Sequence, residues 1–242
     1  MRIYLPLFCA LIFAHSAAAE DFELKIPPAS TTLEVKGQPV RITAWGAVSA
    51  GGQDVFRLSL TADLSDVQAN IGPLLASQLD RSDRCGERLS VESATLAPAS
   101  PSALLIAHVH YERYACIKAL GKNMATRLVG GNAVLNVKLT PSISPDGISI
   151  AADVQKIDAD GSLGELLESG SFGTAIKEKI AKSIESSLRK GLDLKSTLPP
   201  QVASAAALRG ARFASGPEGR LWFSLDGQVH ISAAQLQSLK LR

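Results

Sequence analysis

Alternation of apolar and polar residues predicts β-strands along most of the chain. From Phe56 to Leu64 every second residue is apolar, which places one strand face in a core and the other in water. The same alternation recurs in four later segments separated by turn-forming residues. These segments, which predict an antiparallel meander, are residues 89–96, 103–114, 129–140 and 148–155.

Shorter segments at both ends of this region add strands. Residues 33–36 and 40–48 flank Gly37-Gln38-Pro39 and predict an N-terminal β-hairpin. Residues 208–214 and 220–225 predict strands that return to the sheet near the end of the chain. Residues 113–127 follow neither a strand nor a helix period, and two readings stay open there, a long turn or a short helix.

Two segments have helical spacing. A helix start at Ser65 is followed by apolar residues up to Leu79, which predicts a short helix with a kink at Gly72-Pro73. Ser162 and Glu165 fit a capping box. Beyond them an apolar residue recurs every four positions between Phe172 and Leu188, which predicts a long amphipathic helix over 171–190 of about 30 Å.

These elements predict an α+β fold, in which a curved antiparallel β-sheet wraps around the long amphipathic helix. The shorter helix and the N-terminal hairpin complete it. We expect a signal peptide at 1–19, an N-terminal lead and hairpin at 20–52, and one α+β domain at 53–242.

The first nineteen residues have the features of an export signal. Arg2 precedes an apolar run from Ile3 to Ala14, and Ala17-Ala18-Ala19 offers a cleavage site before Glu20. The apolar run is short for a permanent membrane span. We therefore expect a periplasmic or secreted protein.

Export changes the interpretation of the cysteines. With Cys9 removed, Cys85 and Cys116 remain, and an even number in an oxidising compartment favours one disulfide. The competing interpretation is a pair of free or metal-bound thiols, but no CxxC spacing supports it.

Composition narrows the function classes. The hydrophobic fraction is 46% and the charged fraction 20%, which is typical of a globular protein and excludes a mostly disordered, collagen-like or coiled-coil chain. The formal net charge of +2 is too small to favour nucleic-acid binding.

Residues 162–232 resemble the closing half of a module in the tubular lipid-binding superfamily, the group of bactericidal/permeability-increasing protein. The resemblance is carried by SLGELLESGSFGTAIKEKIAKSIESSLRKGLDLKSTLPP and by ALRGARFASGPEGRLWFSLDGQVHIS. In that superfamily a long striped helix precedes a proline-marked exit and a returning strand, and Gly219–Gly227 looks like that strand. Many relatives carry two modules in tandem, whereas this chain has room for one, so a single module or a homodimer is expected.

The resemblance implies an apolar tunnel for acyl chains between helix and sheet. The residues expected to line it are apolar members of the predicted strands and helices, and each would look the same in an ordinary filled core. They are Leu58, Leu60, Ile71, Leu135, Val137, Ile148, Ile150, Phe172, Ile176, Ile180 and Ile184.

Positive charge gathers in the segment without a clear period. Arg113, Lys118, Lys122 and Arg127 could bind an anionic headgroup or a membrane surface; a solvated turn is the alternative.

Candidate catalytic and metal motifs are weak. His108, His110 and Glu112 share a strand face with a spacing that metal sites use. Nothing places His230, the remaining histidine of the mature chain, near them, so a solvent-facing or hydrogen-bonded strand face is the preferred interpretation. Asp158-Ala159-Asp160-Gly161 lacks the spacing of a calcium loop, and a turn into a capped helix explains it. Gly130-Gly131-Asn132 lacks the Gly-Lys-Ser/Thr of a phosphate loop.

No G-x-S-x-G or HExxH motif occurs in the sequence. We therefore predict no enzymatic activity and no cofactor. The predicted function is an exported envelope protein that sequesters acyl chains or another hydrophobic ligand between helix and sheet. The alternative is a non-catalytic structural or protein-interaction module with a filled core.

Overall fold

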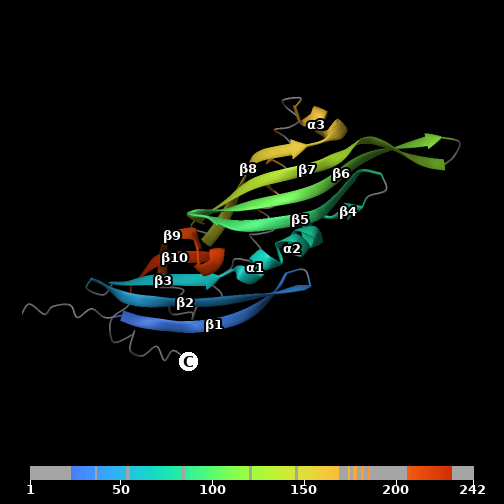
Figure 1. Cartoon of the computed structure of the whole chain (residues 1–242). Helices are drawn as coiled ribbons and strands as arrows, with labels where there is room; N and C mark the ends of the chain where they lie inside the picture. The colour runs from blue at the N-terminus through green and yellow to red at the C-terminus, as the bar shows by residue number, and fades with distance from the viewer. Residues whose placement is uncertain are drawn as a thin grey trace, which may run out of the picture.

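Two five-stranded antiparallel sheets form the architecture of the protein (Figure 1). The computed structural model describes residues 23–35, 37–52, 55–82, 85–119, 122–144, 147–168 and 206–230, with Thr174, Lys177, Glu178, Ala181, Lys182 and Glu185. The strands are β1 (Glu23–Val35), β2 (Gln38–Gly52), β3 (Val55–Asp63), β4 (Arg81–Ser82), β5 (Glu87–Ala99), β6 (Ser102–Ala119), β7 (Lys122–Ser144), β8 (Gly147–Ala159), β9 (Ala206–Ser215) and β10 (Leu221–His230). The helices are α1 (Ser65–Ala69), α2 (Ile71–Leu79), α3 (Gly161–Glu168) and a short 3₁₀ turn, Pro217–Gly219.

The first sheet combines both ends of the described chain, in the order β1-β2-β3-β10-β9. The strands β1 and β2 form the N-terminal hairpin, and Gly37 takes a φ of 80° at its turn, a conformation that favours glycine. The strand β10 returns to pair with β3, so that Trp222 lies opposite Asp63. This pairing brings together segments that are far apart in sequence.

The second sheet is a continuous meander, in the order β4-β5-β6-β7-β8. Its period-two pattern sorts side chains by face, as the sequence predicts. The buried face of β6 and β7 carries Leu105, Val109, Leu135 and Val137, of which Val137 has no exposed surface. The segments predicted as four strands are thus confirmed as β5 to β8 of one sheet.

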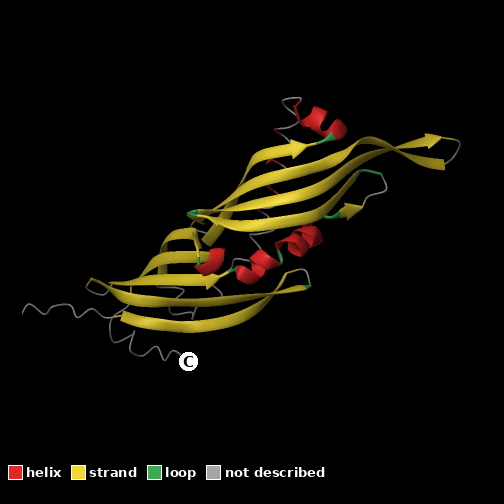
Figure 2. Ribbon diagram, in the orientation of Figure 1, coloured by secondary structure: helices red, strands yellow, loops and turns green. Residues whose placement is uncertain are grey.

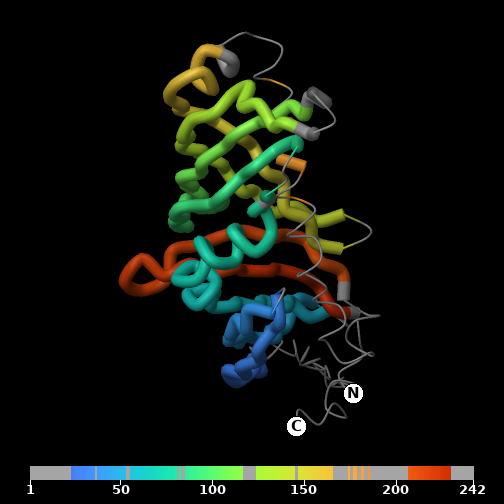
Figure 3. The backbone as a smooth tube through the Cα atoms, turned by 90° about the vertical axis from the view of Figure 1, so that its right-hand side faces the viewer, coloured from blue at the N-terminus to red at the C-terminus, as the bar shows by residue number. Residues whose placement is uncertain are grey.

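Helices and a strand of the first sheet cover this apolar face. In the cartoon, α1 and α2 lie beside β5, and in the rotated view they cross in front of β9 and β10 of the first sheet (Figures 2 and 3). Ile71 of α2 and Phe213 of β9 belong to the same buried cluster as Leu105 and Val137. The backbone N–H of Phe213 also donates to the carbonyl of Pro101 at 2.9 Å, which joins the two sheets by a hydrogen bond. One core therefore spans both sheets.

The predicted fold, a single curved sheet wrapped around a long amphipathic helix, is wrong. In the described part of the chain there are two sheets and three short α-helices. The reason is the pairing of β10 with β3 and β9. This pairing adds the last two strands to the first sheet, whereas the prediction placed all strands in one sheet around a helix. Alternation shows that a strand has a buried face, but it does not show which element covers that face.

The helical predictions also need correction. The helix that follows Ser65 breaks at Asn70 into α1 and α2, and Pro73 stands in the first turn of α2, where proline is tolerated. The helix α3 begins at Gly161, and the Ser162 hydroxyl contacts Gly130 and caps no helix N-terminus. Of the predicted helix 171–190, six residues are described, and all six are helical.

Residues 1–19, predicted to be a signal peptide, lie outside the described residues.

Candidate functional site

The most distinctive surface of the described chain is a long two-stranded ribbon at one end of the second sheet. The pairing of β5 with β6 ends at Glu87 and Arg113, whereas β6 and β7 continue to pair as far as Ala119 and Lys122. Figure 1 shows this end of β6 and β7 projecting beyond the neighbouring strands. We call residues 113–119 and 122–128 the distal hairpin. It corrects the interpretation of 113–127 as a turn or short helix.

A disulfide ties the distal hairpin to the chain that precedes β5. Cys116 is bonded to Cys85, with their Cα atoms 5.4 Å apart, which confirms the predicted pair. The backbone N–H of Tyr114 donates to the carbonyl of Gly86 at 2.7 Å, and the Arg88 guanidinium stacks 4.3 Å from the centre of the Tyr114 ring. An isolated two-stranded hairpin is marginally stable in water, so these contacts hold the ribbon in place.

Two large apolar side chains of the distal hairpin face water. Met124 is 59% exposed and Leu128 is 56% exposed, and they are the exposed large hydrophobic residues of the described chain. Leu128 is the extra residue of a β-bulge, because Arg113 pairs with Val129 while Tyr114 pairs with Arg127. Both residues lie on the projecting hairpin, and exposed apolar residues beside polar ones favour a role in binding.

The charge of the distal hairpin has a single sign. Residues 113–128 contain Arg113, Lys118, Lys122 and Arg127 and no acidic residue. All four predicted headgroup residues therefore lie on this hairpin. Lys118 pairs with Asn123 and Lys122 with Ala119 near its tip, while Arg113 and Arg127 lie near its base and are exposed. The structure thus combines clustered positive charge with exposed apolar side chains.

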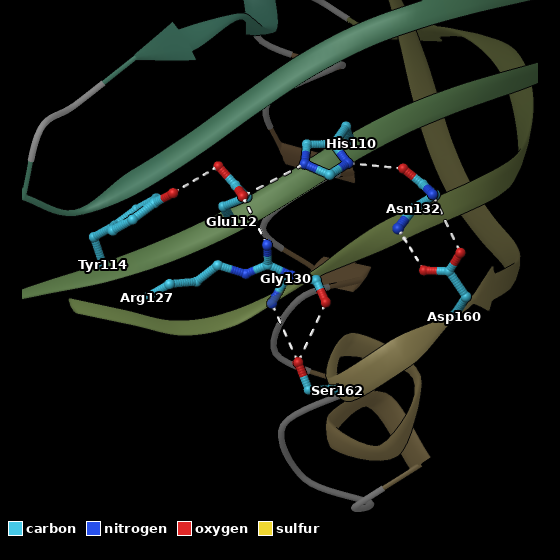
Figure 4. Close-up of polar contacts among 8 residues, drawn as sticks. All are labelled: His110, Glu112, Tyr114, Arg127, Gly130, Asn132, Asp160 and Ser162. Carbon is cyan, nitrogen blue, oxygen red and sulfur yellow. Dashed lines mark hydrogen bonds and ion pairs between the residues drawn. The ribbon is translucent and has the colours of Figure 1, made fainter.

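At its base, the distal hairpin joins a row of polar contacts that crosses the second sheet on the face opposite the core (Figure 4). Glu112 accepts a hydrogen bond from the Tyr114 hydroxyl at 3.0 Å and one from Arg127 at 3.2 Å. The Nε2 atom of His110 lies 3.7 Å from the same Glu112 Oε1 atom. Glu112 is therefore the anion that holds the base of the hairpin.

The row continues across β7 to the end of β8. His110 Nδ1 lies 2.7 Å from Asn132 Oδ1, and Asn132 donates to Asp160 from its backbone N–H at 2.7 Å and its side-chain amide at 3.2 Å. These donated bonds, the backbone bond foremost, lower the pKa of Asp160 below its usual value. Asp160 is therefore ionised at neutral pH.

Six of the seven described residues predicted to line an acyl tunnel belong to the main core or pack against it. Leu58 packs with Val48, Phe56 and Val229 in a separate cluster of the first sheet. Four of the others are buried members of the main core, namely Ile71, Leu135, Val137 and Ile150, and Leu60 and Ile148 are partly buried against it. Phe172, Ile176, Ile180 and Ile184 lie outside the described residues.

Two open grooves lie along the first sheet, away from these residues. One, of about 570 Å³, is lined by Arg41, Thr43 and Asp63 among others. The second, of about 520 Å³, includes Trp45 and Thr61. The first is lined by hydroxyl and charged groups, which do not suit an acyl chain. The lining of the second is more apolar and includes Ile26 and Trp45.

The other candidate motifs take part in ordinary structure. Among the described residues no group of three or more histidine, cysteine or acidic residues could hold a metal ion, and His110 instead bonds Asn132. Asp160 is hydrogen-bonded to Asn132, and Gly130 is hydrogen-bonded to Ser162. The acidic motif at 158–161 and the glycine motif at 130–132 therefore both belong to the contact between β7 and α3. The helices described here are too short or too polar to cross a membrane.

Sequence patterns alone did not single out Met124 and Leu128 as functional residues. The signal that could have found them is the absence of any acidic residue between Arg113 and Leu128, together with apolar residues that follow no period. Comparison with protein-family models, with curated proteins and with solved structures finds no match for this chain.

Proposed function

We propose that this protein is an exported, non-catalytic module that docks on anionic lipid surfaces through its distal hairpin. The observation that carries the proposal is the coincidence of exposed Met124 and Leu128 with four cations and no anion on one projecting hairpin. Anionic headgroups attract the cations, and apolar side chains enter the boundary between headgroups and acyl chains.

The expected affinity is modest. Each basic residue near an anionic surface contributes about 1 kcal/mol. Arg127 is paired with Glu112, so the other three contribute up to about 3 kcal/mol. Burial of the exposed parts of Met124 and Leu128 adds about 1 kcal/mol each. A total of about 5 kcal/mol corresponds to a dissociation constant on the order of 0.1–1 mM, which is reversible docking.

The disulfide supports the placement outside the cytoplasm. Cys85 and Cys116 are both exposed in the structure, and a bond between exposed cysteines persists in an oxidising compartment such as the periplasm or the extracellular space. Together with the predicted signal peptide, this favours a periplasmic or secreted protein facing a membrane surface.

Sequestration of an acyl chain has weaker support. That mechanism depended on a helix enclosed by one sheet, and the two-sheet fold removes this premise. The resemblance to the tubular lipid-binding superfamily stays a prediction. Organic extraction of protein purified from its own host tests both, because a carrier releases lipid and a docking module with a filled core does not.

Co-sedimentation with vesicles tests docking directly. We expect wild-type protein to bind phosphatidylglycerol vesicles at about 50 mM salt and to bind them less at about 500 mM salt. It should not bind phosphatidylcholine vesicles. Lys118→Glu with Lys122→Glu should abolish binding. Met124→Ser with Leu128→Ser should weaken it about thirtyfold, since the two apolar residues contribute about 2 kcal/mol together.

A charge-matched control separates docking from a general effect of net charge. Lys25→Glu with Lys138→Glu reverses two exposed lysines outside the distal hairpin and changes the net charge by the same amount. This control should bind the vesicles far better than the hairpin double variant. Equal loss in the two variants, or no binding by the wild type, overturns the proposal.

A further inference from the structure

The imidazole of His110 lies between two polar partners that constrain its protons. Its Nδ1 atom is 2.7 Å from Asn132 Oδ1, and its Nε2 atom is 3.7 Å from Glu112 Oε1 (Figure 4). The His110 side chain is 38% exposed, whereas Glu112 is 17% exposed. The ring is therefore open to solvent protons, while its carboxylate partner is largely covered.

The hydrogen bonds of Asn132 determine the tautomer of His110. Asp160 is ionised and only accepts hydrogen bonds, so the Asn132 amide nitrogen must face it and the amide oxygen must face His110. An amide oxygen only accepts, so His110 Nδ1 carries the hydrogen. In the neutral ring the Nε2 atom then has no hydrogen and points its lone pair toward the Glu112 carboxylate.

Proton uptake at Nε2 removes this mismatch. It converts two facing acceptors into a donor and an acceptor, an imidazolium N–H beside a carboxylate. Glu112 Oε1 also holds Arg127 at 3.2 Å, so the new N–H competes with the guanidinium for one oxygen. The charged and titratable groups around the ring include His108, Glu112 and Tyr114 of β6, of which His108 is exposed two residues away on the same face. Arg127 of β7 and Asp160 after β8 are the others, with Arg88 of β5 behind Tyr114.

We propose that His110 is an acid-responsive switch of the distal hairpin: its protonation satisfies Glu112, frees Arg127 for anionic headgroups and tightens docking on a lipid surface. The inference rests on the proposed docking function and adds its regulation. Arg127 is one of the four cations of the hairpin and its side chain is 53% exposed, so it can turn from Glu112 toward a phosphate. A charged imidazole also adds positive potential at the base of the hairpin.

Vesicle binding at two pH values tests the switch. We expect wild-type protein to bind phosphatidylglycerol vesicles two- to fivefold tighter at about pH 5 than at about pH 7.5, since one more basic group at such a surface has about that effect. His110→Gln should bind equally at both. The matched control is His108→Gln, which removes an exposed histidine of the same strand and should keep the wild-type pH response.

A second measurement needs no vesicles. Nitrogen chemical shifts of the His110 ring should show the hydrogen on Nδ1 at about pH 7.5 and on both nitrogens at about pH 5. A neutral ring with its hydrogen on Nε2 contradicts the assignment from Asn132 and overturns the switch.

The outcomes of the two proposals differ. Wild-type binding that is equally tight at both pH values, or a pH response that His108→Gln removes and His110→Gln keeps, overturns the switch and leaves docking intact. Absence of wild-type binding at both pH values overturns docking and its regulation together.

Discussion

Removal of the disulfide between Cys85 and Cys116 is expected to destabilise the protein strongly. The bond closes a loop with a sequence separation of 31 residues. In the chain-entropy treatment, opening such a loop raises the entropy of the unfolded chain and lowers the free energy of unfolding by about 3.7 kcal/mol at 25 °C. Because whole domains unfold at about 5–15 kcal/mol, this loss is a large fraction of the total.

Urea unfolding of the Cys85→Ser, Cys116→Ser variant measures the loss. Tryptophan fluorescence reports on Trp45 and Trp222, whose rings are in edge contact in the first sheet, while far-ultraviolet circular dichroism follows the strands of both sheets. The unfolding midpoint should fall by about 1–4 M urea. Wild-type protein treated with a reducing agent is the control, and it should match the variant.

The loss of stability on removal of the disulfide should be largest at the distal hairpin. Amide hydrogen exchange of residues 114–119 and 122–127 should speed up more than that of β10. The reason is that the disulfide anchors the distal hairpin, whereas β10 belongs to the other sheet. A loss below about 1 kcal/mol refutes the loop-closure reasoning, and uniform acceleration throughout both sheets refutes the local anchoring of the distal hairpin.

Two further predictions test the core and the titration of a tyrosine. Leu105→Ala, at a position only 2% exposed, should lower the free energy of unfolding by about 2–5 kcal/mol in urea titrations, whereas Leu128→Ala, at an exposed position, should change it by less than about 0.5 kcal/mol. Similar effects for the two variants would contradict the burial. Burial, and secondarily the Glu87 carboxylate, raises the pKa of Tyr111 above its ordinary value, so the folded state favours the protonated phenol. The stability that this shift contributes is present below the unfolded pKa of about 10 and is lost as the pH rises through the folded pKa. Urea midpoints of wild-type protein should therefore fall more steeply above about pH 10 than those of Tyr111→Phe. Parallel curves for the two proteins would exclude the effect.

The sequence by itself determined the features that depend on near neighbours. Alternation over 103–114 and 129–140 predicted strands that the structure extends to β6 and β7, because a strand with one buried face must repeat every two residues. The pairing of Cys85 with Cys116 followed from cysteine number and predicted compartment, and it is confirmed.

The distal hairpin shows where local patterns stop being informative. Among the residues between Arg113 and Leu128 whose burial is described, none is buried, and apolar and charged residues of this segment follow no period. Alternation reports burial, and a strand with two exposed faces gives no such signal. The charge of this segment was visible in the sequence, but its projection from the sheet was not.

Only the tertiary structure decided how the strands divide into sheets. The strand β10 pairs with β3 across more than half of the chain, and Phe213 of β9 completes the core of the other sheet. A long-range pairing depends on which surfaces remain uncovered once the local elements have formed, and several elements could cover the same apolar face. The alignment of His110, Asn132 and Asp160 arose in the same way, since neighbouring strands had to meet in one register before three separate polar residues could form a single row.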